Sequence, residues 1–182
     1  MGAGSVEAVV CSGRSTGFPR QGVSLSQTGD FMHFVGRRYD DTSVHAELSK
    51  FSYDLIENNE DKSIDIRFDW KGQKKTLTLV QILAMLLKNI KENAESYLEE
   101  PVRAAILVVP TSFSDGQRKR VRDAAALAEL SVTRMIAPSI AAGLSYQVET
   151  RRRIGQRNTL VCSIGARYTE ASALHIDGSK IE

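Results

Sequence analysis

Residues 104–117, AAILVVPTSFSDGQ, carry two structural signals in direct succession. The run from Ala104 to Val109 is continuously apolar, which is typical of a strand buried on both faces. Ser114 then precedes Gln117 by three residues, the spacing of a capping box at the start of a helix, and we expect that helix to run to about Glu129. A buried strand followed so closely by a helix predicts an α/β protein.

The same alternation continues downstream. Residues 132–136 predict a short strand, and Pro138, at a first-turn position, begins a predicted helix that ends near Tyr146. Two further strands are predicted at residues 159–162 and 171–176. This order of elements predicts a mixed sheet covered by helices.

A hairpin and a long helix precede these elements. Residues 64–69 alternate strictly between apolar and polar, which predicts a strand with one solvated face, and residues 74–77 return as its partner after a turn at 71–73. Thr78 and Gln81 form a second capping-box pattern, and the helix that follows carries one apolar stripe. The stripe consists of Leu79, Ile82, Leu83, Leu86, Leu87, Ile90 and Ala94, and Pro101 follows the end of the helix.

The N-terminal segment, residues 1–26, is rich in Gly and Ser, and any strand there is expected to be an isolated edge piece. Residues 31–35 then place apolar side chains at helical spacing, and Gly36 ends this predicted helix. A second short helix is predicted through Val44 and Leu48.

Composition limits the class of protein. The 182 residues are 42% hydrophobic and 25% charged, which suits one globular domain or one half of a larger bilobed one. The longest apolar runs stop well short of the roughly 18 residues of a membrane span, and no basic region precedes an apolar stretch at the N-terminus. We therefore expect neither a span nor a cleaved secretory signal. The net charge of +2 does not argue for nucleic acid, so a soluble cytoplasmic protein is expected.

The cysteines and histidines predict no metal centre. Cys11 and Cys162 are too few for a disulfide framework or a zinc site, and Cys162 is expected to be buried as a small hydrophobic residue on its strand. His33, His45 and His175 lack the spacing of metal ligands.

Five segments of this chain resemble one protein family in their order and spacing. Residues 34–41, FVGRRYDD, place a Gly, a basic pair, an aromatic residue and Asp at the end of a helix, and residues 105–115 are similar to the family segment TVPAYFND. Residues 124–130 resemble DAGxIAGL, and residues 136–146 resemble NEPTAAAIAY with the Tyr one place late. Together with residues 158–165, they make residues 27–182 similar to the nucleotide-binding domain of the 70-kDa heat-shock protein chaperones.

This resemblance implies an actin-like ATPase fold, of the ribonuclease-H-like kind, reduced to its first lobe. Residues 27–101 would form the outer subdomain of lobe I, a smaller α+β unit, and residues 102–182 the inner subdomain, a mixed sheet with flanking helices. An active member of the family would be an ATPase that binds ATP and magnesium in a cleft between two lobes.

The phosphate chemistry of such an ATPase needs a Gly-rich hairpin, a Lys near the transferred phosphoryl group, and acidic residues that hold magnesium and orient water. The family's first hairpin, Asp-Leu-Gly-Thr-Thr, has no clear counterpart here. By the resemblance, the catalytic Lys falls on Met32, an acidic residue on Ala137, and the Asp of the second phosphate loop on Ser163. Gly165 persists in that loop and is the remaining cofactor-binding candidate. These substitutions predict that the chain is not an enzyme.

Other positions of the family persist. Pro110, Asp115 and Arg118 match residues of the inner subdomain, and the resemblance implies that the Pro and the Arg belong to a relay between the nucleotide state and the linker side of the domain. A Pro after a buried strand and an Arg in the first turns of a helix are also common structural features, so preservation of the scaffold is the alternative interpretation.

The former cleft face is the predicted interaction surface. In a two-lobed relative this face would be covered by nucleotide and by the opposite lobe, whereas here Met32, Ile140 and Tyr168 place apolar or aromatic side chains on it. These residues predict contact with another protein, such as a co-chaperone or an assembly subunit, and none with a membrane. The run Arg151-Arg152-Arg153 is expected to be a solvated loop, with contact to an anion or a nucleic acid as the alternative.

The sequence is compatible with three functions. The leading hypothesis is a degenerate nucleotide-binding lobe that acts as a non-catalytic interaction or structural module. The first alternative is a fragment of an ATP-dependent protein-folding chaperone whose second lobe and substrate domain lie outside this chain. The second alternative is a structural subunit of a large assembly. ATP and magnesium are expected as cofactors only if activity is retained.

Overall fold

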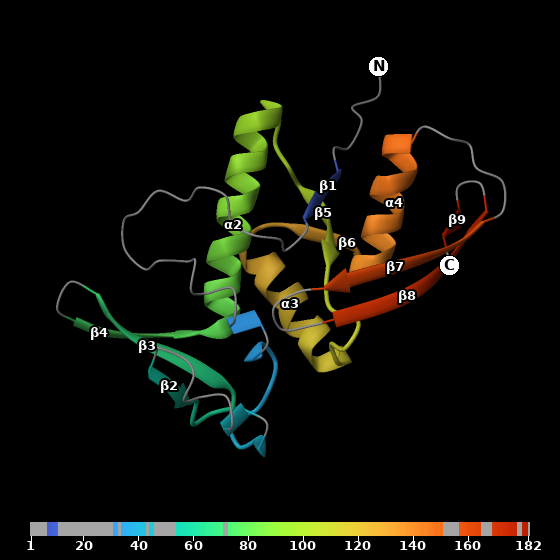
Figure 1. Cartoon of the computed structure of the whole chain (residues 1–182). Coiled ribbons are helices and arrows are strands. Elements are labelled where there is room, and N and C mark those ends of the chain that lie inside the picture. Colours follow the sequence, from blue (N-terminus) through green and yellow to red (C-terminus); the bar gives the residue numbers. More distant parts are fainter. Residues whose placement is uncertain are drawn as a thin grey trace. The chain divides into compact units, whose positions relative to one another are not determined.

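A computed structural model describes residues 7–10, 31–32, 34–42, 44–45, 54–70, 73–150, 157–164, 169–177 and 180–181 (Figure 1). The strands are β1 (Glu7–Val10), β2 (Asp54–Glu57), β3 (Ile64–Trp70), β4 (Gln73–Thr78), β5 (Ala104–Val108), β6 (Ser131–Ile136), β7 (Arg157–Ile164), β8 (Thr169–Asp177) and β9 (Lys180–Ile181). The helices are α2 (Leu79–Leu98), α3 (Asp115–Leu127) and α4 (Pro138–Thr150). Strands and helices are mixed along the chain, which confirms the α/β class. Within these ranges, no helix has the length and apolar character needed to cross a membrane.

The described strands form three three-stranded sheets, β1-β5-β6, β2-β3-β4 and β7-β8-β9. The strands from residue 104 onward thus fall in two sheets rather than in the one mixed sheet that their order predicted. Two of the three sheets are built from consecutive antiparallel strands. Short connections allow neighbouring strands to pair as hairpins, whereas the order of elements alone does not state which strands pair. β1 lies at an edge of its sheet, as expected for an N-terminal strand, but it pairs with β5 and is not the isolated piece that was predicted.

The chain divides into two compact units. The first comprises Met1–Ala8, Gly13–Ala105 and Phe113–Val132. The second comprises Val9–Ser12, Ile106–Ser112 and Thr133–Glu182. The sheet β2-β3-β4 and the helices α2 and α3 therefore belong to the first unit, and α4 with the sheet β7-β8-β9 belongs to the second.

In the first unit, β3 and β4 form the predicted hairpin, with Asp65 opposite Thr78, and the turn residues 71–72 lie outside the described residues. Ile64 and Ile66 are buried, as the alternating pattern predicted. Asp65 was expected on the solvated face, but it is also buried, with 7% of its surface exposed. β3 is the central strand of its sheet and Asp65 pairs next to the start of α2, so both faces of the strand are covered at this end.

Both predicted capping boxes are present. At the start of α2, Thr78 Oγ1 accepts a hydrogen bond from the Gln81 amide at 3.1 Å, and Gln81 Oε1 accepts one from the Thr78 amide at 3.0 Å. Ser114 and Gln117 make the equivalent pair at the start of α3, which ends at Leu127, two residues earlier than expected. α2 packs against α3. The buried residues of α2 are Leu79, Leu83, Ala84 and Leu87, and all but Ala84 belong to the predicted stripe.

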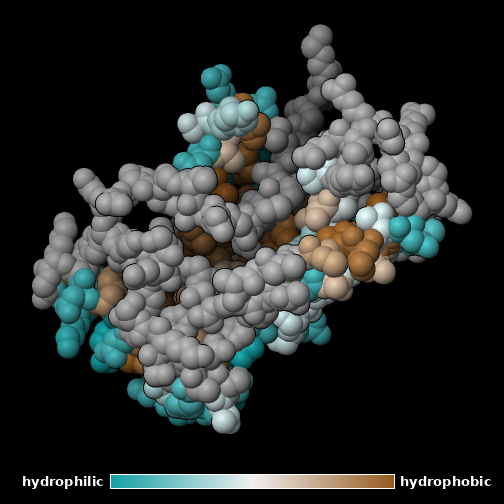
Figure 2. Space-filling view, viewed as in Figure 1, coloured by the Kyte–Doolittle hydropathy of each residue, from teal (hydrophilic) through white to brown (hydrophobic). Residues whose placement is uncertain are grey.

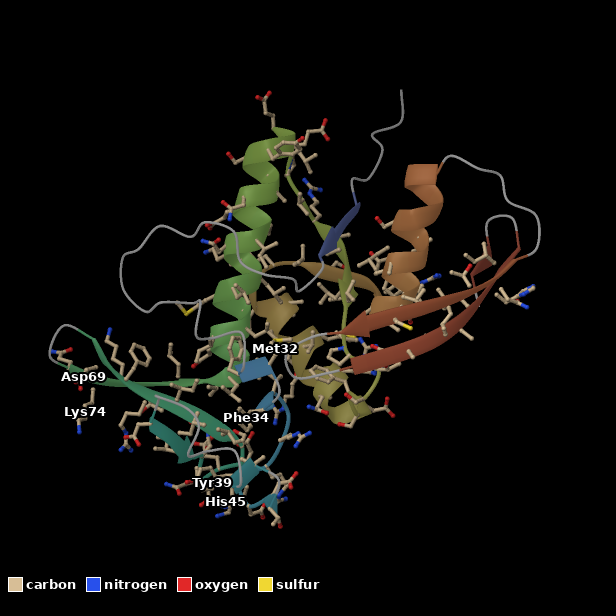
Figure 3. The ribbon with its side chains drawn as sticks, viewed as in Figure 1. Met32, Phe34, Tyr39, His45, Asp69 and Lys74 are labelled. Carbon is tan, nitrogen blue, oxygen red and sulfur yellow. The ribbon has the colours of Figure 1, made fainter. Side chains whose placement is uncertain are left out.

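The two short helices predicted before residue 50 differ in outcome. The first is a 3₁₀ turn that stops at Gly36, whose φ of 73° lies in the left-handed region and cannot continue a right-handed helix. The second is helical at Val44 and His45, and its predicted continuation to Leu48 lies outside the described residues. The rings of Tyr39 and His45 pack edge to face with their centroids 5.2 Å apart (Figure 3).

The strand predicted at residues 104–109 is present as β5, but it is not buried on both faces. Ala105 and Leu107 are buried, whereas the residues that alternate with them remain partly exposed. Such a period of two indicates that one face of the strand is covered more completely than the other. The continuous apolar run therefore predicted more burial than this strand has.

In the second unit, α4 begins at Pro138 as predicted and continues past Tyr146 to Thr150. It packs on β7 and β8, which pair antiparallel from Arg157 opposite Ile176 to Ile164 opposite Thr169. The predicted strands at 159–162 and 171–176 lie within β7 and β8 and are confirmed.

Cys162 is exposed, which corrects the expectation that it is buried. Leu160, two residues earlier on β7, is 70% exposed, so both side chains lie on the open face of the hairpin. Leu174 and Ile176 of β8 are buried. Figure 2 shows hydrophobic surface over the β7–β8 hairpin. The residue type alone predicted a buried thiol. Cys162 is exposed because its side chain lies on the face of β7 that no other described element covers.

Candidate functional site

Met32, at the position where the resemblance places a catalytic Lys, lies in the 3₁₀ turn before Gly36 (Figure 3). Its side chain is half-buried, whereas its neighbours Phe31 and Phe34 are buried. A thioether carries no positive charge and no N–H or O–H donor. Met32 therefore presents no group that could offset the charge of a phosphoryl oxygen.

Ala137, at the position of an acidic residue, joins β6 to α4 in the second unit. Its carbonyl accepts the amide of Ala141 at 3.1 Å, which is the first hydrogen bond of the helix. Its half-buried methyl group cannot bind a metal ion or orient water. Ala137 therefore has a backbone role at the start of α4.

Ser163 lies near the end of β7 and pairs with Glu170 of β8, while Gly165 and Tyr168 lie outside the described residues. The carboxylate of Glu170 accepts a hydrogen bond from the hydroxyl of Thr111, within the same unit. No local sequence pattern marks Glu170, because its partner Thr111 lies 59 residues away in the chain. The hydrogen bond ties β8 to the segment that follows β5.

The three relay candidates occupy the segment from the end of β5 into α3. Pro110 is half-buried, and Asp115 is the exposed first residue of α3. The guanidinium Nε of Arg118 donates a hydrogen bond to the carbonyl of Phe113 at 3.2 Å. This bond connects Arg118 to the residues just before α3, as the scaffold interpretation expects, and the relay stays a prediction.

Of the predicted interface residues, Ile140 is half-buried on α4. The basic run Arg151-Arg152-Arg153 lies outside the described residues. Met32 belongs to the first unit, and Ala137, Ile140 and Ser163 belong to the second, so the cleft face that they were predicted to share stays a prediction.

In the first unit, the turn at Gly36 approaches α3 very closely. A Cβ atom added to Gly36 would lie 2.8 Å from the Cα atom of Gln117, closer than real Cβ contacts. Gln117 is itself buried and forms the capping box with Ser114. Glycine is therefore required here both for its positive φ and for the approach of two backbones.

Two acidic side chains near the connection of β2 to β3 have different surroundings, Asp61 in the loop at residues 58–63 and Asp65 in β3. Burial raises the pKa of the Asp65 carboxyl. Its Oδ2 atom accepts one hydrogen bond from the side-chain amide of Asn58 at 3.1 Å. Asp65 Oδ1 has no partner among the described residues. A hydrogen bond with the side chain of Ser63 is the main cause that lowers the pKa of Asp61. The backbone amide of Ser63, which donates to Asp61 at 3.0 Å, and Arg120, which donates at 2.9 Å, lower it further.

No group of three or more His, Cys, Asp or Glu side chains that could hold a metal ion occurs in the part of the chain that the structure describes. The residues that the structure does bring together in the first unit are Gly36, Gln117, Asp61 and Arg120, which sequence reasoning had not combined. Their separation along the chain, 59 residues between Asp61 and Arg120, leaves no local signal from which to find them.

Comparison with known proteins gives a consistent result. The family model described as Hsp70 protein matches residues 26–182. Heat shock cognate 70 kDa protein 3 of Dictyostelium discoideum is 33% identical over 154 residues, covering 84% of this chain and 24% of that protein. Heat shock 70 kDa protein of Neurospora crassa is 34% identical over 148 residues, covering 81% of this chain and 22% of that protein. A ribosome-associated molecular chaperone of Eremothecium gossypii is 32% identical over 149 residues, covering 82% and 24%. The chain thus spans about a quarter of the length of these relatives.

Proposed function

The chain belongs to the Hsp70 family, and on this premise we propose that it is a degenerate nucleotide-binding lobe that acts as a non-catalytic interaction or structural module. Membership of the family implies an actin-like ATPase fold. The observation that carries the proposal is the loss of charged groups at the positions where the resemblance places phosphate chemistry.

Met32 supports the proposal most directly. A Lys at this position would bring a full positive charge toward a transferred phosphoryl group, whereas the half-buried thioether brings none. Removing one well-placed electrostatic group typically slows an enzyme by about 100-fold to 1,000-fold. Retention of activity at the family's rate would require another cation to replace this charge.

Ala137 and Ser163 weaken the magnesium side of the site in the same way. Magnesium prefers carboxylate oxygens and water as ligands, and neither a methyl group nor a neutral hydroxyl replaces a carboxylate. Gly165 would be the residual backbone contact to a phosphate. We therefore propose that neither ATP nor magnesium is a resident cofactor of this chain.

The proposal also assigns two subdomains, a location and a set of contact residues to the chain. Residues 27–101 would form the outer subdomain and residues 102–182 the inner subdomain of one lobe, in the cytoplasm. Met32, Ile140 and Tyr168 would contact a protein partner, and Pro110 with Arg118 would retain a coupling role only if nucleotide binds.

A second candidate function is favoured by one observation. The chain spans about a quarter of the length of the Dictyostelium discoideum and Neurospora crassa relatives. This favours a fragment of an ATP-dependent chaperone whose second lobe and substrate domain lie outside this chain. A third candidate is a structural subunit of a large assembly. Sequencing the full transcript separates the second candidate from the others, and identification of proteins that co-purify from the native source separates the third.

The catalytic part of the proposal is tested by single-turnover hydrolysis of ATP with excess protein and magnesium. We expect no phosphate release above a control that contains a magnesium chelator. Thermal melting with and without ATP and magnesium should give the same midpoint, because a ligand stabilises a protein in proportion to its binding. Chelator-sensitive phosphate release, or a clear rise of the midpoint with ATP, would show that the site survives.

The interaction part is tested by substitution on the proposed interface. Tyr168→Asp should abolish association with native partners without changing the unfolding midpoint. Tyr97→Asp is the matched control, because Tyr97 on α2 is 87% exposed and lies outside the proposed interface. Unchanged recovery of every partner by the Tyr168 variant would reject this surface.

A further inference from the structure

The loop at residues 58–63, between β2 and β3 of the first unit, is connected to two other elements through carboxyl side chains. Asp65 in β3 accepts a hydrogen bond at Oδ2 from the side-chain amide of Asn58 at 3.1 Å. Asp61, in the loop itself, accepts one at Oδ2 from Arg120 of α3 at 2.9 Å. The loop is therefore held between β3 and α3 by one bond to a buried carboxyl group and one from an exposed carboxyl group.

Asn58 organises the inside of this loop. Its backbone amide donates to the Ser63 carbonyl at 2.9 Å, and its own carbonyl accepts from the Lys62 amide at 3.0 Å. Its side-chain Oδ1 accepts from the Glu60 amide at 2.9 Å, while Nδ2 donates to Asp65. Because the same side chain bonds to the loop backbone and to Asp65, a change in the charge of that carboxyl group acts on the hydrogen bonds inside the loop.

The surroundings of Asp65 favour its neutral form. Only 7% of its surface is exposed, and its Oδ1 atom has no hydrogen-bond partner in the described part of the chain. An ionised carboxylate that is buried from water needs several donors to replace its hydration, and Asn58 supplies one. Burial accordingly raises the pKa of Asp65 more than this bond lowers it, and the nearby charge of Asp61 raises the pKa further.

The surroundings of Asp61 favour its ionised form. Its Oδ1 atom accepts the Ser63 amide at 3.0 Å and its Oδ2 atom accepts Arg120. The pKa of Asp61 is lowered mainly by a hydrogen bond with the Ser63 side chain, and further by the Ser63 amide and by Arg120. Two neighbouring carboxyl groups whose pKa values move in opposite directions differ in protonation over a range of pH. Within that range, Asp61 is ionised and Asp65 is neutral.

Other charged side chains next to the loop form ion pairs of their own. They are Lys62 with Glu57 at 2.8 Å, Arg67 with Asp54 at 3.6 Å, and Arg38 with Asp40 at 3.0 Å. Arg37, which lines a pocket together with Asp61, also has an interaction of its own. The residues opposite Asp65 on the two neighbouring strands, Ile56 and Thr78, are uncharged. Asp61 is therefore the charged neighbour that acts on the pKa of Asp65.

We propose that Asp61 and Asp65 form a two-carboxyl latch, which holds the loop at residues 58–63 closed while Asp61 is ionised and Asp65 is protonated. At lower pH, Asp61 gains a proton and its bonds to Ser63 and Arg120 weaken, so the loop separates from α3. At higher pH, Asp65 ionises and its unpartnered Oδ1 atom requires hydration. The loop moves to admit water, because the strands on both sides of β3 are fixed by their ladders of hydrogen bonds. Acidification from neutral pH therefore closes the latch, and stronger acidification opens it again.

The test is amide hydrogen exchange of the whole chain, followed by NMR between about pH 2 and pH 7 and corrected for the exchange rate of an unstructured peptide at each pH. The reporters are the amides of Glu60 and Lys62, because both donate to Asn58 and neither donates to a titrating carboxyl group. We expect their protection to reach a maximum near about pH 4 and to fall severalfold on both sides. The amide of Leu87, in the buried part of α2, should not follow this profile. A loop profile without a maximum, or the same maximum at Leu87, overturns the proposal.

Three variants assign the two sides of the profile. Asp65→Asn keeps the size and an acceptor oxygen of the side chain but cannot ionise, so the fall of protection at higher pH should disappear. Asp61→Asn should remove the fall at lower pH. Asp69→Asn is the matched control, because Asp69 is an exposed carboxyl group further along β3, and this variant should keep the maximum (Figure 3). A fall at higher pH that persists in Asp65→Asn, or a maximum that is lost in Asp69→Asn, would refute the latch.

A measurement on the unsubstituted protein keeps the proposal testable if a variant fails to fold. The carboxyl carbon resonances of Asp61 and Asp65 report the protonation of each side chain directly. We expect Asp61 to titrate at lower pH than Asp65, and the loop amides to be most protected between the two midpoints. Titration in the opposite order, or at one common midpoint, contradicts the latch. Neither measurement involves ATP, so the failure of this proposal and that of the proposed function are distinguishable.

Discussion

Gly36→Ala is expected to destabilise the first unit strongly, because two separate constraints act at this position. The backbone holds φ at +73°, where a residue with a Cβ atom is strained. The added Cβ would also lie 2.8 Å from Gln117 Cα, a backbone atom at the start of α3 that cannot move without shifting the helix. The first constraint belongs to the turn itself, and the second comes from the contact of the turn with α3.

The magnitude follows from adding the two effects. A left-handed conformation costs an ordinary residue about 1–2 kcal/mol. Forcing an extra methyl group into a well-packed contact costs about 1–3 kcal/mol. We therefore expect a loss of about 2–5 kcal/mol, a large part of the roughly 5–15 kcal/mol that stabilises a typical protein. With an ordinary denaturant dependence, the urea midpoint should fall by about 1–2 M.

The assay is urea unfolding followed by circular dichroism, with Gly116→Ala as the control. Gly116 lies in the first turn of α3, where a Cβ atom would meet only Ser114 Oγ at 3.8 Å, an ordinary contact. Alanine there should be neutral or stabilising by up to about 1 kcal/mol. Gly36→Asn separates the two effects, because Asn tolerates a positive φ but keeps the close contact. A Gly36→Ala protein within about 0.5 kcal/mol of the wild type would refute the reasoning.

Three further outcomes are expected. Burial raises the pKa of Asp65 above its unfolded value, so just above about pH 4 the folded protein holds a proton that the unfolded chain has lost. The free energy of unfolding should therefore fall as the pH rises through that window. Asp65→Asn should remove this fall in unfolding measurements between about pH 3 and pH 7, and parallel pH profiles of the variant and the wild type would contradict the prediction. Thr78→Ala should cost about 0.5–2 kcal/mol by removing the cap of α2, and the exposed Thr76→Ala should cost less, as measured by urea unfolding. In a Cys11→Ser protein, Cys162 should react with a thiol reagent in the folded state nearly as fast as in urea, and strong protection would mean that the thiol is buried after all.

The elements that the sequence predicted well are those specified by neighbouring residues. Thr78 with Gln81 and Ser114 with Gln117 begin helices because each pair satisfies its own backbone donors within one turn. The β3–β4 hairpin follows for the same reason, since its alternating strand and its turn lie within a short segment. For the candidate site, only the residue types could be predicted from the sequence. The identities of Met32, Ala137 and Ser163 were visible in the sequence, but their surroundings were not.

The sequence by itself therefore determined the α/β class and the two capped helices, since these depend on residue type and local spacing. The uncharged residues at the expected phosphate positions are what the family resemblance implies. Only the tertiary structure decided that Asp65 is buried, that Cys162 is exposed, and that Arg120 meets Asp61 across 59 residues. These outcomes depend on which surface covers each side chain, and that is set by contacts between segments far apart in the chain, for which short-range patterns carry no signal.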